Sequence, residues 1–387
     1  MSDAFRNIPF GMPILGEEEK TKVMEVLSGP ILVHGPRAKE FEASFAAYAG
    51  SRHALSVSSC TAALHLAYFY LGIGSGDEVI VPAQTHVATA HAVELCGAKP
   101  VFVDAENKAG NIDLEQIEKQ ITERTKAISV VHFLGMPVNM ERLNQIAKKN
   151  KLFVVEDCAL AIGAYFKGVH AGLHGDVGCF SFYPVKHMTT GEGGMLLTQN
   201  DAIAAKIQRQ KAFGVDRHMG ERSVPGVYDV TMLGFNYRLG EIAAAMGIEQ
   251  IKRLPFFLKR REENYRALEK ALQEIPEIRL LQSSHGDYQS SYYCLSALLK
   301  KPLQPKRFEI VSLLKEKGVG TSVYYPRPVP HFSYYRDKYG YGADSFPVAA
   351  EISNSSISLP VGPHLSKEDM SYIAEAFKSS ILASKKK

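Results

Sequence analysis

The chain lacks the features that mark several large classes of protein. Its 387 residues include only five cysteines, Cys60, Cys96, Cys158, Cys179 and Cys294, an odd number with no CxxC pair. This pattern argues against both a disulfide framework and a zinc site, so we predict no bound metal. No run of apolar residues is long enough to span a bilayer, which argues against a membrane protein.

The chain also lacks an excess of charge of either sign. Its 45 Lys and Arg residues nearly balance 41 Asp and Glu, which gives no electrostatic reason to expect a nucleic-acid partner. The one basic run, Lys385–Lys387, ends the sequence and reads as a solvated tail. The opening MSDAFRNIPFGMP is polar and unlike a signal peptide. We therefore expect a soluble, cytoplasmic protein with neither nucleic acid nor membrane as a partner.

Between about residues 38 and 250, short apolar segments alternate with helical ones. Seven segments read as strands: HALSVS (53–58), DEVIVPA (77–83), KPVFVDA (99–105), AISVVHF (127–133), KLFVVEDC (151–158), GCFSFYP (178–184) and GGMLLTQ (193–199). They are rich in β-branched residues and continuously apolar, which is typical of strands buried on both faces of a sheet. The alternation predicts an α/β fold.

The pattern changes near residue 250. Residues 240–254 and 255–275 read as two helices separated at Pro255. Shorter mixed elements follow, and a helix over 366–382 closes the chain, with Ser366 as N-cap and Asp369 at the capping-box spacing. We predict a large α/β domain over residues 1–250, N-terminal arm included, and a smaller α+β domain over 251–387.

Three stretches could carry chemistry, although each also has an ordinary structural explanation. In VSSCTAALHLA (57–67) a strand gives way to a helix start, which suits either a phosphate or a simple N-cap. Asp157 ends an apolar strand, at the sheet edge where ligands of α/β proteins bind, but it could merely cap the next segment. Lys186, in SFYPVKHMTTGEGG, could be a surface residue, a phosphate contact or a Schiff-base nucleophile.

Taken together, the three stretches supply the groups that a pyridoxal 5'-phosphate (PLP) site needs. The phosphate needs hydrogen-bond donors, the pyridinium nitrogen needs an anion and the aldehyde needs an amine. Burial and nearby cations favour the neutral, nucleophilic form of a lysine amine. His132 and His187 are possible neighbours of Lys186, although a lone histidine is more often structural.

Ordered motifs along nearly the whole chain resemble the DegT/StrS-type nucleotide-sugar aminotransferases, PLP enzymes of the aspartate aminotransferase fold. These motifs are PILGEEEKTKVMEVL, GPRAKEFEASFAAYAG, SVSSCTAALHLA, GDEVIVPAQTHVATAHAV, VVHFLGMPVNM, VVEDCALAIGA, GDVGCFSFYPVKHMTTGEGG, GFNYRLGEIAAAMG and SISLPVGPHLSKEDM. The resemblance implies a fold type I PLP-dependent transferase: a large domain with a mixed, mostly parallel seven-stranded sheet flanked by helices, and a smaller C-terminal α+β domain. It also implies PLP as cofactor, pyridoxamine 5'-phosphate as its aminated form, and a homodimer with shared active sites.

The resemblance assigns roles to matching positions. Lys186 matches the catalytic lysine that forms the Schiff base and moves the proton, and Asp157 matches the partner of the pyridinium nitrogen. His86 matches the aromatic position stacked on the cofactor ring. The phosphate-binding positions are Ser181, Thr61 and Ala62.

Other positions match less directly. Asn236 matches an asparagine that reaches the phosphate of the neighbouring subunit, Arg238 is a candidate for the donor carboxylate or a substrate phosphate, and His331 is a weaker candidate for the substrate pocket. The sequence departs from the family at two positions. Leu160 replaces a glutamine that bonds the cofactor's phenolic oxygen, so another group or water must serve, and Cys60 replaces a glycine of the phosphate turn.

The resemblance implies transfer of an amino group from L-glutamate to a nucleotide-linked keto-sugar in a ping-pong scheme. KHMTTGEGG resembles members that aminate C-4 of 4-keto-6-deoxyhexoses more than the KNLGALGDGG style of C-3 enzymes. We expect an amino sugar for a surface polysaccharide, such as a lipopolysaccharide O-antigen. The sequence does not specify the sugar or the nucleotide.

Three alternatives remain beside this hypothesis. The deoxysugar 3-dehydratases resemble SFYPxHH, with histidine in place of the lysine, so Lys186 argues against them even though His187 follows. A non-catalytic PLP-binding regulatory protein is disfavoured because no signalling or DNA-binding module is present. A cysteine desulfurase shares the fold, but none of the five cysteines lies in a matching glycine-rich loop.

Overall fold

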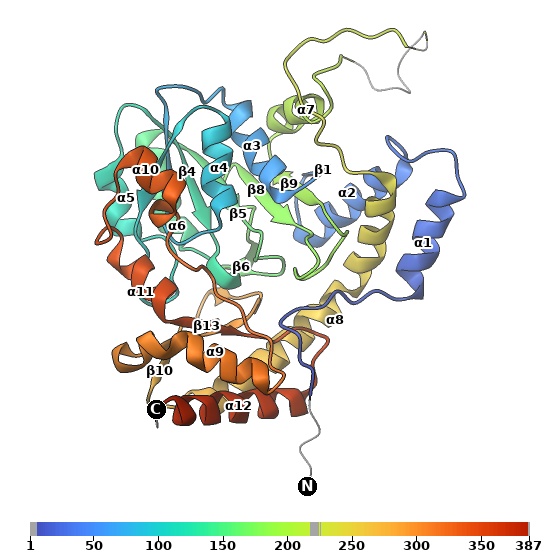
Figure 1. Cartoon of the computed structure of the whole chain (residues 1–387). Helices are drawn as coiled ribbons and strands as arrows, with labels where there is room; N and C mark the ends of the chain where they lie inside the picture. The colour runs from blue at the N-terminus through green and yellow to red at the C-terminus, as the bar shows by residue number, and fades with distance from the viewer. Residues whose placement is uncertain (1–5, 217–223, 225, 386–387) are drawn as a thin grey trace.

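The protein is built around one seven-stranded sheet, described here from a computed structural model that covers residues 6–216, 224 and 226–385 (Figure 1). The strand order is β1-β9-β8-β5-β4-β2-β3, and β9 alone runs antiparallel to its neighbours. The strands are β1 (His53–Val57), β2 (Glu78–Pro82), β3 (Lys99–Val103), β4 (Thr125–Val131), β5 (Phe153–Asp157), β8 (Val177–Ser181) and β9 (Gly194–Thr198). Each of the seven expected segments forms one strand, which confirms the predicted mostly parallel α/β sheet.

Helices bury both faces of this sheet, which is why its strands are continuously apolar. In β2, Val79 and Val81 pack into one hydrophobic cluster, whereas Ile80, between them, packs into another. The first cluster includes side chains of α3 (Cys60–Tyr70), α4 (Val87–Leu95) and α7 (Asp201–Gln210), and the second those of α5 (Leu114–Gln120) and α6 (Met140–Asn150). A third cluster lies between the sheet, α2 (Pro36–Ala49) and α8 (Glu241–Leu272).

Helix α8 is continuous over 32 residues, so the prediction of two helices separated at Pro255 is wrong. Proline removes one backbone hydrogen bond, but the ring of Pro255 faces solvent, while Leu254 and Phe257 beside it are fully buried. Packing against α1 (Glu17–Leu27), α2 and the C-terminal helix α12 (Lys367–Lys385) also supports the helix. The expected domain border near residue 250 falls inside α8, and the division into two domains stays a prediction.

A smaller antiparallel sheet, β10 (Ile278–Leu280), β12 (Leu295–Leu299) and β13 (Ser356–Leu359), packs with α9 (Arg307–Glu316), α12 (Lys367–Lys385) and the second half of α8. Ile8 pairs with Val319, so the N-terminal arm joins this C-terminal part. The predicted capping box is confirmed, because Ser366 and Asp369 each accept the other's backbone N–H. The remaining elements are β6 (Tyr165–Phe166), β7 (Val169–His170), β11 (Tyr288–Gln289), η1 (Phe133–Gly135), η3 (Lys301–Lys306), η4 (Val329–His331), α10 (Ser333–Tyr339) and α11 (Pro347–Ser355).

None of the helices in the described part of the chain combines the length and the apolar character that crossing a membrane requires. All five cysteines are free thiols.

Candidate active site at the carboxyl edge of the sheet

Most of the candidate residues gather where parallel strands end. Strands β1, β2, β5 and β8 run in the same direction, so their carboxyl ends share one edge of the sheet. The chain then leads from β1 into α3, from β2 to His86, from β5 to Asp157 and from β8 through Ser181 to Lys186. The fold therefore places these residues around one edge, where ligands of α/β sheets bind.

The turn into α3 offers backbone donors for an anion. Ser59 caps the helix, and its hydroxyl accepts the N–H of Ala62 at 3.1 Å. The other N–H groups of the first turn, Thr61 included, have no acceptor within the helix. The backbone of Gly194 passes so close that a Cβ there would lie 2.5 Å from the carbonyl carbon of Ser59. A phosphate fits this helix start.

Asp157 is a buried carboxylate with capacity left for one more partner. Its Oδ2 accepts a 2.8 Å hydrogen bond from the Thr89 hydroxyl, and its Oδ1 accepts the backbone N–H of Ala159 at 3.0 Å. The thiol of Cys60 lies 3.9 Å from the same Oδ1. Burial and the charge of Asp157 raise the pKa of Cys60 well above its usual value, so the thiol stays protonated and can donate. Two carboxylate oxygens provide about four acceptor sites, so a protonated ring nitrogen remains a compatible partner.

Lys186 is half-buried, and its amine lies over the ring of Tyr293, 5.4 Å from the centroid. Among the described residues, no carboxylate forms an ion pair with it. Burial lowers the pKa of Lys186, and the charges of Cys60, Asp157 and Cys294 oppose that shift only in part. Such an amine is neutral more often than a surface lysine, as a Schiff-base nucleophile requires.

His86 and Ser181 complete this edge. His86 is the N-cap of α4, where its Nδ1 accepts the N–H of Ala88 at 3.2 Å, and its ring lies 5.8 Å from that of Tyr325. The side chain of His86 is exposed on one side, but the protein packed around it lowers its pKa by desolvation, which favours the neutral ring suited to stacking. Ser181 is buried, and its hydroxyl accepts the N–H of Tyr183 at 3.4 Å.

Asn236 and Arg238 lie on a segment that runs beside the phosphate turn. Ser58 donates its N–H to the carbonyl of Tyr237 at 2.8 Å, and Arg238 bridges to Val57. The side chain of Asn236 is exposed, as contact with another subunit would need. Arg238 lies 5.0 Å from the ring centroid of Phe213, and its Nε is buried without a hydrogen-bond partner among the described residues.

His331 is placed differently from the other candidates. It belongs to η4, and its Nε2 is hydrogen-bonded to the carbonyl oxygen of Ser345 at 2.8 Å. Val329 of the same turn donates its N–H to Ala83, which holds η4 near the end of β2. The ring of His331 is thus engaged in a C-terminal contact, and the structure does not bring it against Lys186 or Asp157.

The two departures from the family pattern lie inside the site. Leu160 is buried in the core cluster, and its carbonyl accepts the Ser291 hydroxyl at 2.7 Å. Its side chain has no group to bond a phenolic oxygen. Cys60 is the first residue of α3 and directs its thiol at Asp157, so it does more than tighten the turn.

The structure adds three residues that the sequence analysis missed: Thr89, Tyr293 and Tyr325. Thr89 bonds Asp157, Tyr293 contacts the lysine amine, and Tyr325 packs against His86. Thr89 lies three residues beyond His86 in PAQTHVATA, so helical spacing was an available signal. The two tyrosines come from distant segments, and no local pattern links them to Lys186.

A buried trio, His132, Glu156 and Cys158, has the geometry to hold a metal ion but is already hydrogen-bonded. His132 donates from Nε2 to Glu156 at 2.9 Å and accepts the Val138 N–H on Nδ1 at 3.1 Å. Glu156 also accepts three backbone N–H groups, from Gly172, His174 and Gly175. Since both histidine nitrogens are engaged, the trio reads as a structural network.

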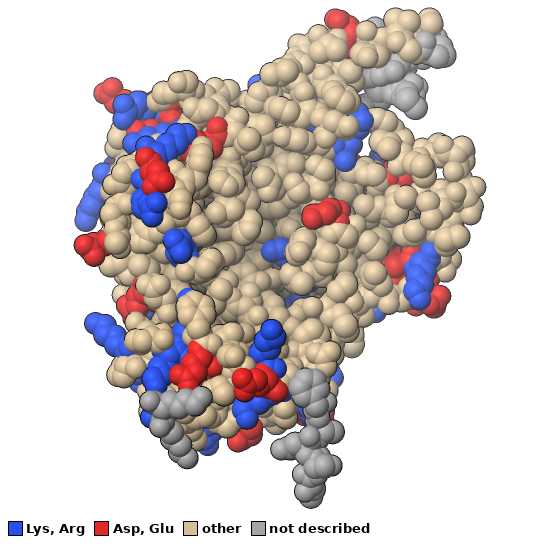
Figure 2. Space-filling model, in the orientation of Figure 1, with Lys and Arg blue, Asp and Glu red and all other residues tan. Residues whose placement is uncertain are grey.

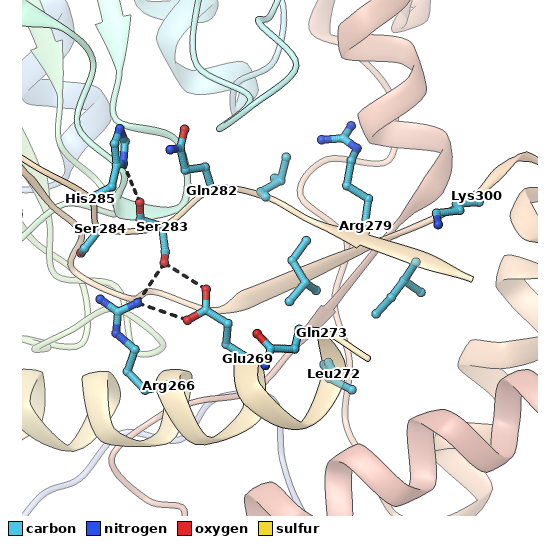
Figure 3. A pocket seen from close by; sticks show the side chains of 13 residues that line it. Arg266, Glu269, Leu272, Gln273, Arg279, Gln282, Ser283, Ser284, His285 and Lys300 are labelled. Carbon is cyan, nitrogen blue, oxygen red and sulfur yellow. Dashed lines mark hydrogen bonds and ion pairs between the residues drawn. The ribbon is translucent and has the colours of Figure 1, made fainter. Parts of the chain in front are cut away.

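A groove of about 670 Å³ lies away from the sheet edge, between the end of α8 and β10 (Figure 3). Two of its charged groups satisfy each other: Arg266 pairs with Glu269 at 3.2 Å, and Ser283 bonds both. His285 is hydrogen-bonded through Nδ1 to the carbonyl oxygen of Ser283. None of the sequence-predicted site residues lines this groove.

Comparisons with known proteins agree with the edge site. The model of the DegT/DnrJ/EryC1/StrS aminotransferase family matches residues 13–378. The chain belongs to this family. It is 37% identical to the spore coat polysaccharide biosynthesis protein SpsC of Bacillus subtilis, over 97% of each chain. It is 35% identical to the GDP-perosamine synthase of Escherichia coli O157:H7, over 95% of this chain and 97% of the other.

Solved structures show the same fold. The PLP form of the sugar aminotransferase Spr1654 from Streptococcus pneumoniae superposes with a TM-score of 0.91 and 29% identity, covering 98% of this chain and 99% of the other. The pyridoxamine 5'-phosphate (PMP) form of the same protein superposes equally well, with a TM-score of 0.92. These similarities confirm the expected fold and the resemblance to sugar aminotransferases.

Proposed function

We propose that the protein is a PLP-dependent aminotransferase that moves an amino group from L-glutamate to a nucleotide-linked keto-sugar. The observation that carries the proposal is the half-buried amine of Lys186, which has no ion-pair partner in the described part of the chain. It lies at the same sheet edge as the carboxylate of Asp157 and the N-terminus of α3. These groups match the aldehyde, ring nitrogen and phosphate of PLP respectively. The PLP and PMP forms of Spr1654 support the choice of cofactor.

Each group of the chain has a defined task in this scheme. When bound, PLP supplies an electron sink for the bond changes at the amino carbon. The first turn of α3, with Thr61 and Ala62, and the hydroxyl of Ser181 hold the phosphate. Asp157 keeps a proton on the ring nitrogen, and His86 stacks on the ring. Lys186 provides the amine and then holds or moves the proton at its Nζ in both half-reactions.

The proposed acceptor is C-4 of a nucleotide-linked 4-keto-6-deoxyhexose, and the product serves a surface polysaccharide such as an O-antigen. Two relatives support this choice by their names, one for spore coat polysaccharide biosynthesis and one for GDP-perosamine, a nucleotide-linked sugar. The motif KHMTTGEGG supports C-4 over C-3. A cytoplasmic location and two domains that meet near residue 250 belong to the same proposal.

We propose a homodimer whose subunits share their active sites. Large apolar side chains are exposed on the loop after α1 and on the loop before α8: Ile31, Leu32, Val33, Phe213, Val227, Tyr228, Val230 and Leu233. Both loops lie on the side of α1 in Figure 1. Figure 2 shows the described part of the loop before α8, which projects from the molecule, mostly without charge. An exposed apolar surface of this kind suits a protein partner. A second copy is the proposed partner because Asn236, on the same segment, is exposed beside the phosphate turn.

An absorption experiment tests the proposal. PLP added to the purified protein should give the visible band of a Schiff base, and L-glutamate should bleach it with release of 2-oxoglutarate. Borohydride reduction followed by peptide mass spectrometry should find the cofactor on Lys186. The Lys186→Ala variant should fold and give no band, and glutamate turnover by that variant would overturn the assignment.

A panel of nucleotide keto-sugars then tests the acceptor. The aminated enzyme should convert a 4-keto-6-deoxyhexose substrate: mass spectrometry should show the gain of the amine, and NMR of the product should place it at C-4. Loss of a sugar hydroxyl without amine transfer would instead indicate the dehydratase alternative. A stable band that glutamate does not change would favour the regulatory alternative.

A further inference from the structure

Arg261 is a buried guanidinium without an anionic partner among the described residues. Its side chain lies on the buried face of α8 and the residue is only 5% exposed. The groups whose charges act on it are Tyr293, Cys294 and Tyr324, none of them a carboxylate. Its Nε has no hydrogen-bond partner in the described part of the chain. An unpaired buried charge is costly, so its position calls for an explanation.

The contacts of Arg261 connect two segments that meet at Lys186. Its Nη1 donates to the carbonyl oxygen of Tyr293 at 2.9 Å, and its Nη2 approaches the carbonyl oxygen of Lys186 at 3.4 Å. Tyr293 is the residue whose ring contacts the lysine amine, at 5.4 Å. The hydroxyl of Tyr293 is hydrogen-bonded to that of Tyr324 at 2.8 Å, which fixes the ring. One guanidinium thus holds the main chain of the lysine and of its aromatic neighbour.

His187 adds an electrostatic consequence. It follows Lys186 in the sequence, and its side chain is buried. Its Nε2 is bonded to the carbonyl oxygen of Ser291, and its Nδ1 has no partner among the described residues. Burial lowers the pKa of His187 well below its usual value, and the charge of Arg261 adds to the effect. His187 is therefore a neutral hydrogen-bonding group beside the lysine.

We propose that Arg261 is a positioning residue: its guanidinium holds the main chains of Lys186 and Tyr293 together so that the lysine side chain stays half-buried against the tyrosine ring. This inference rests on the proposed function. Burial is the largest cause of the lowered pKa of Lys186. Loss of the guanidinium should therefore let the lysine side chain move toward solvent and return its pKa toward the ordinary value.

The test compares Arg261→Gln with the matched control Arg260→Gln in the full chain. Arg260 precedes Arg261 on α8, but it is partly exposed and pairs with Glu263 at 3.5 Å on the surface. Acetic anhydride labelling of Lys186 before PLP is added, read by peptide mass spectrometry across pH, reports the pKa of the amine. We expect the half-labelling pH to rise by about one unit in Arg261→Gln, a tenfold shift in the ratio of charged to neutral amine, and to stay unchanged in Arg260→Gln.

Activity with PLP gives the second readout. In Arg261→Gln kcat should fall and its pH profile should move to higher pH, while KM for glutamate changes little. A folded Arg261→Gln protein with the labelling profile of the wild type would overturn the inference. If this variant does not fold, Arg261→Lys decides: a raised half-labelling pH supports the positioning role, and wild-type labelling and rate overturn it.

Failure of the proposed function has a different signature. If borohydride does not fix PLP to Lys186 in the wild type, the proposed function fails whatever the Arg261 variants do. If PLP is fixed to Lys186 but the labelling profile is insensitive to Arg261, only the positioning role fails.

Discussion

The hydroxyl of Thr89 donates a 2.8 Å hydrogen bond to Oδ2 of Asp157, and both residues are buried. Thr89 is in turn hydrogen-bonded to the hydroxyl of Thr85 at 2.7 Å. Since Thr89 gives its proton to the carboxylate, Thr85 must donate to Thr89. The first turn of α4 therefore fixes the orientation of the carboxylate that would face the cofactor ring.

Replacement of Thr89 by valine keeps the shape of the side chain and removes this bond. A hydrogen bond to a charged group contributes about 1.5–3 kcal/mol, so PLP affinity should fall about tenfold or more. Fluorescence titration with PLP measures this change. Thr85→Val is the matched control, with a smaller loss because it removes only the bond to Thr89. Wild-type affinity in Thr89→Val would show that Asp157 needs no support from α4.

Asp157→Asn tests the carboxylate itself. The amide is nearly isosteric, so the protein should still fold and bind PLP, but it cannot keep the ring nitrogen protonated. The rate of transamination should fall about 100-fold, the lower end of the loss seen when one preorganised electrostatic contact is removed from an active site. Stopped-flow measurement of the glutamate half-reaction gives the rate. A wild-type rate would show that another group is the partner of the ring nitrogen.

The central sheet could be predicted because each strand is apolar on both faces and separated by helical segments. Helix α8 could not be read correctly, because local pattern ends a helix at Pro255 whereas packing of Leu254 and Phe257 carries it through. Two-residue strands such as β6 and β7 leave too short a pattern to be recognised.

The candidate site shows the same division. Asp157 and Lys186 follow apolar strands, so the sequence itself indicates a position at the sheet edge. Tyr293 and Arg261 reach Lys186 from segments about 75 to 107 residues away in the chain, and only the fold brings them there. The orientation of Cys60 toward Asp157 likewise depends on how α3 meets β5.

The proposed dimer can be tested on its exposed apolar loop. Leu233 is 70% exposed, and Leu233→Asp places a charge where a second copy would pack. Light scattering after size-exclusion chromatography should show a shift from dimer to monomer. Activity should fall with it, because Asn236 of one copy could no longer reach the other. Leu382→Asp, on α12, is the control and should leave both unchanged; a dimeric Leu233→Asp protein would place the interface elsewhere.

The stability of the fold should depend on pH through His170. Burial lowers the pKa of His170 to about 4, because the surrounding protein keeps water away from the charged ring. Its Nε2 accepts the N–H of Gly163 at 2.9 Å, and its Nδ1 donates to the carbonyl of Ala171 at 2.6 Å. The bond to Ala171 and the charge of nearby Glu156 oppose the shift, whereas His132 and His174 add to it.

The sign of the effect follows from the two states. In the unfolded chain the histidine binds its proton near pH 6.5, whereas in the folded protein it stays neutral down to about pH 4. Between these values the unfolded state binds more protons, so this part of the stability is present above pH 6.5 and is lost as the pH falls toward 4. The resulting decrease in the free energy of unfolding is about 3 kcal/mol.

Urea unfolding at pH 7, 5.5 and 4.5 should show a midpoint that falls with pH. The His170→Gln variant keeps a donor and an acceptor but does not titrate, so it should flatten that decline. An equally steep decline in His170→Gln would assign the acid sensitivity to other groups.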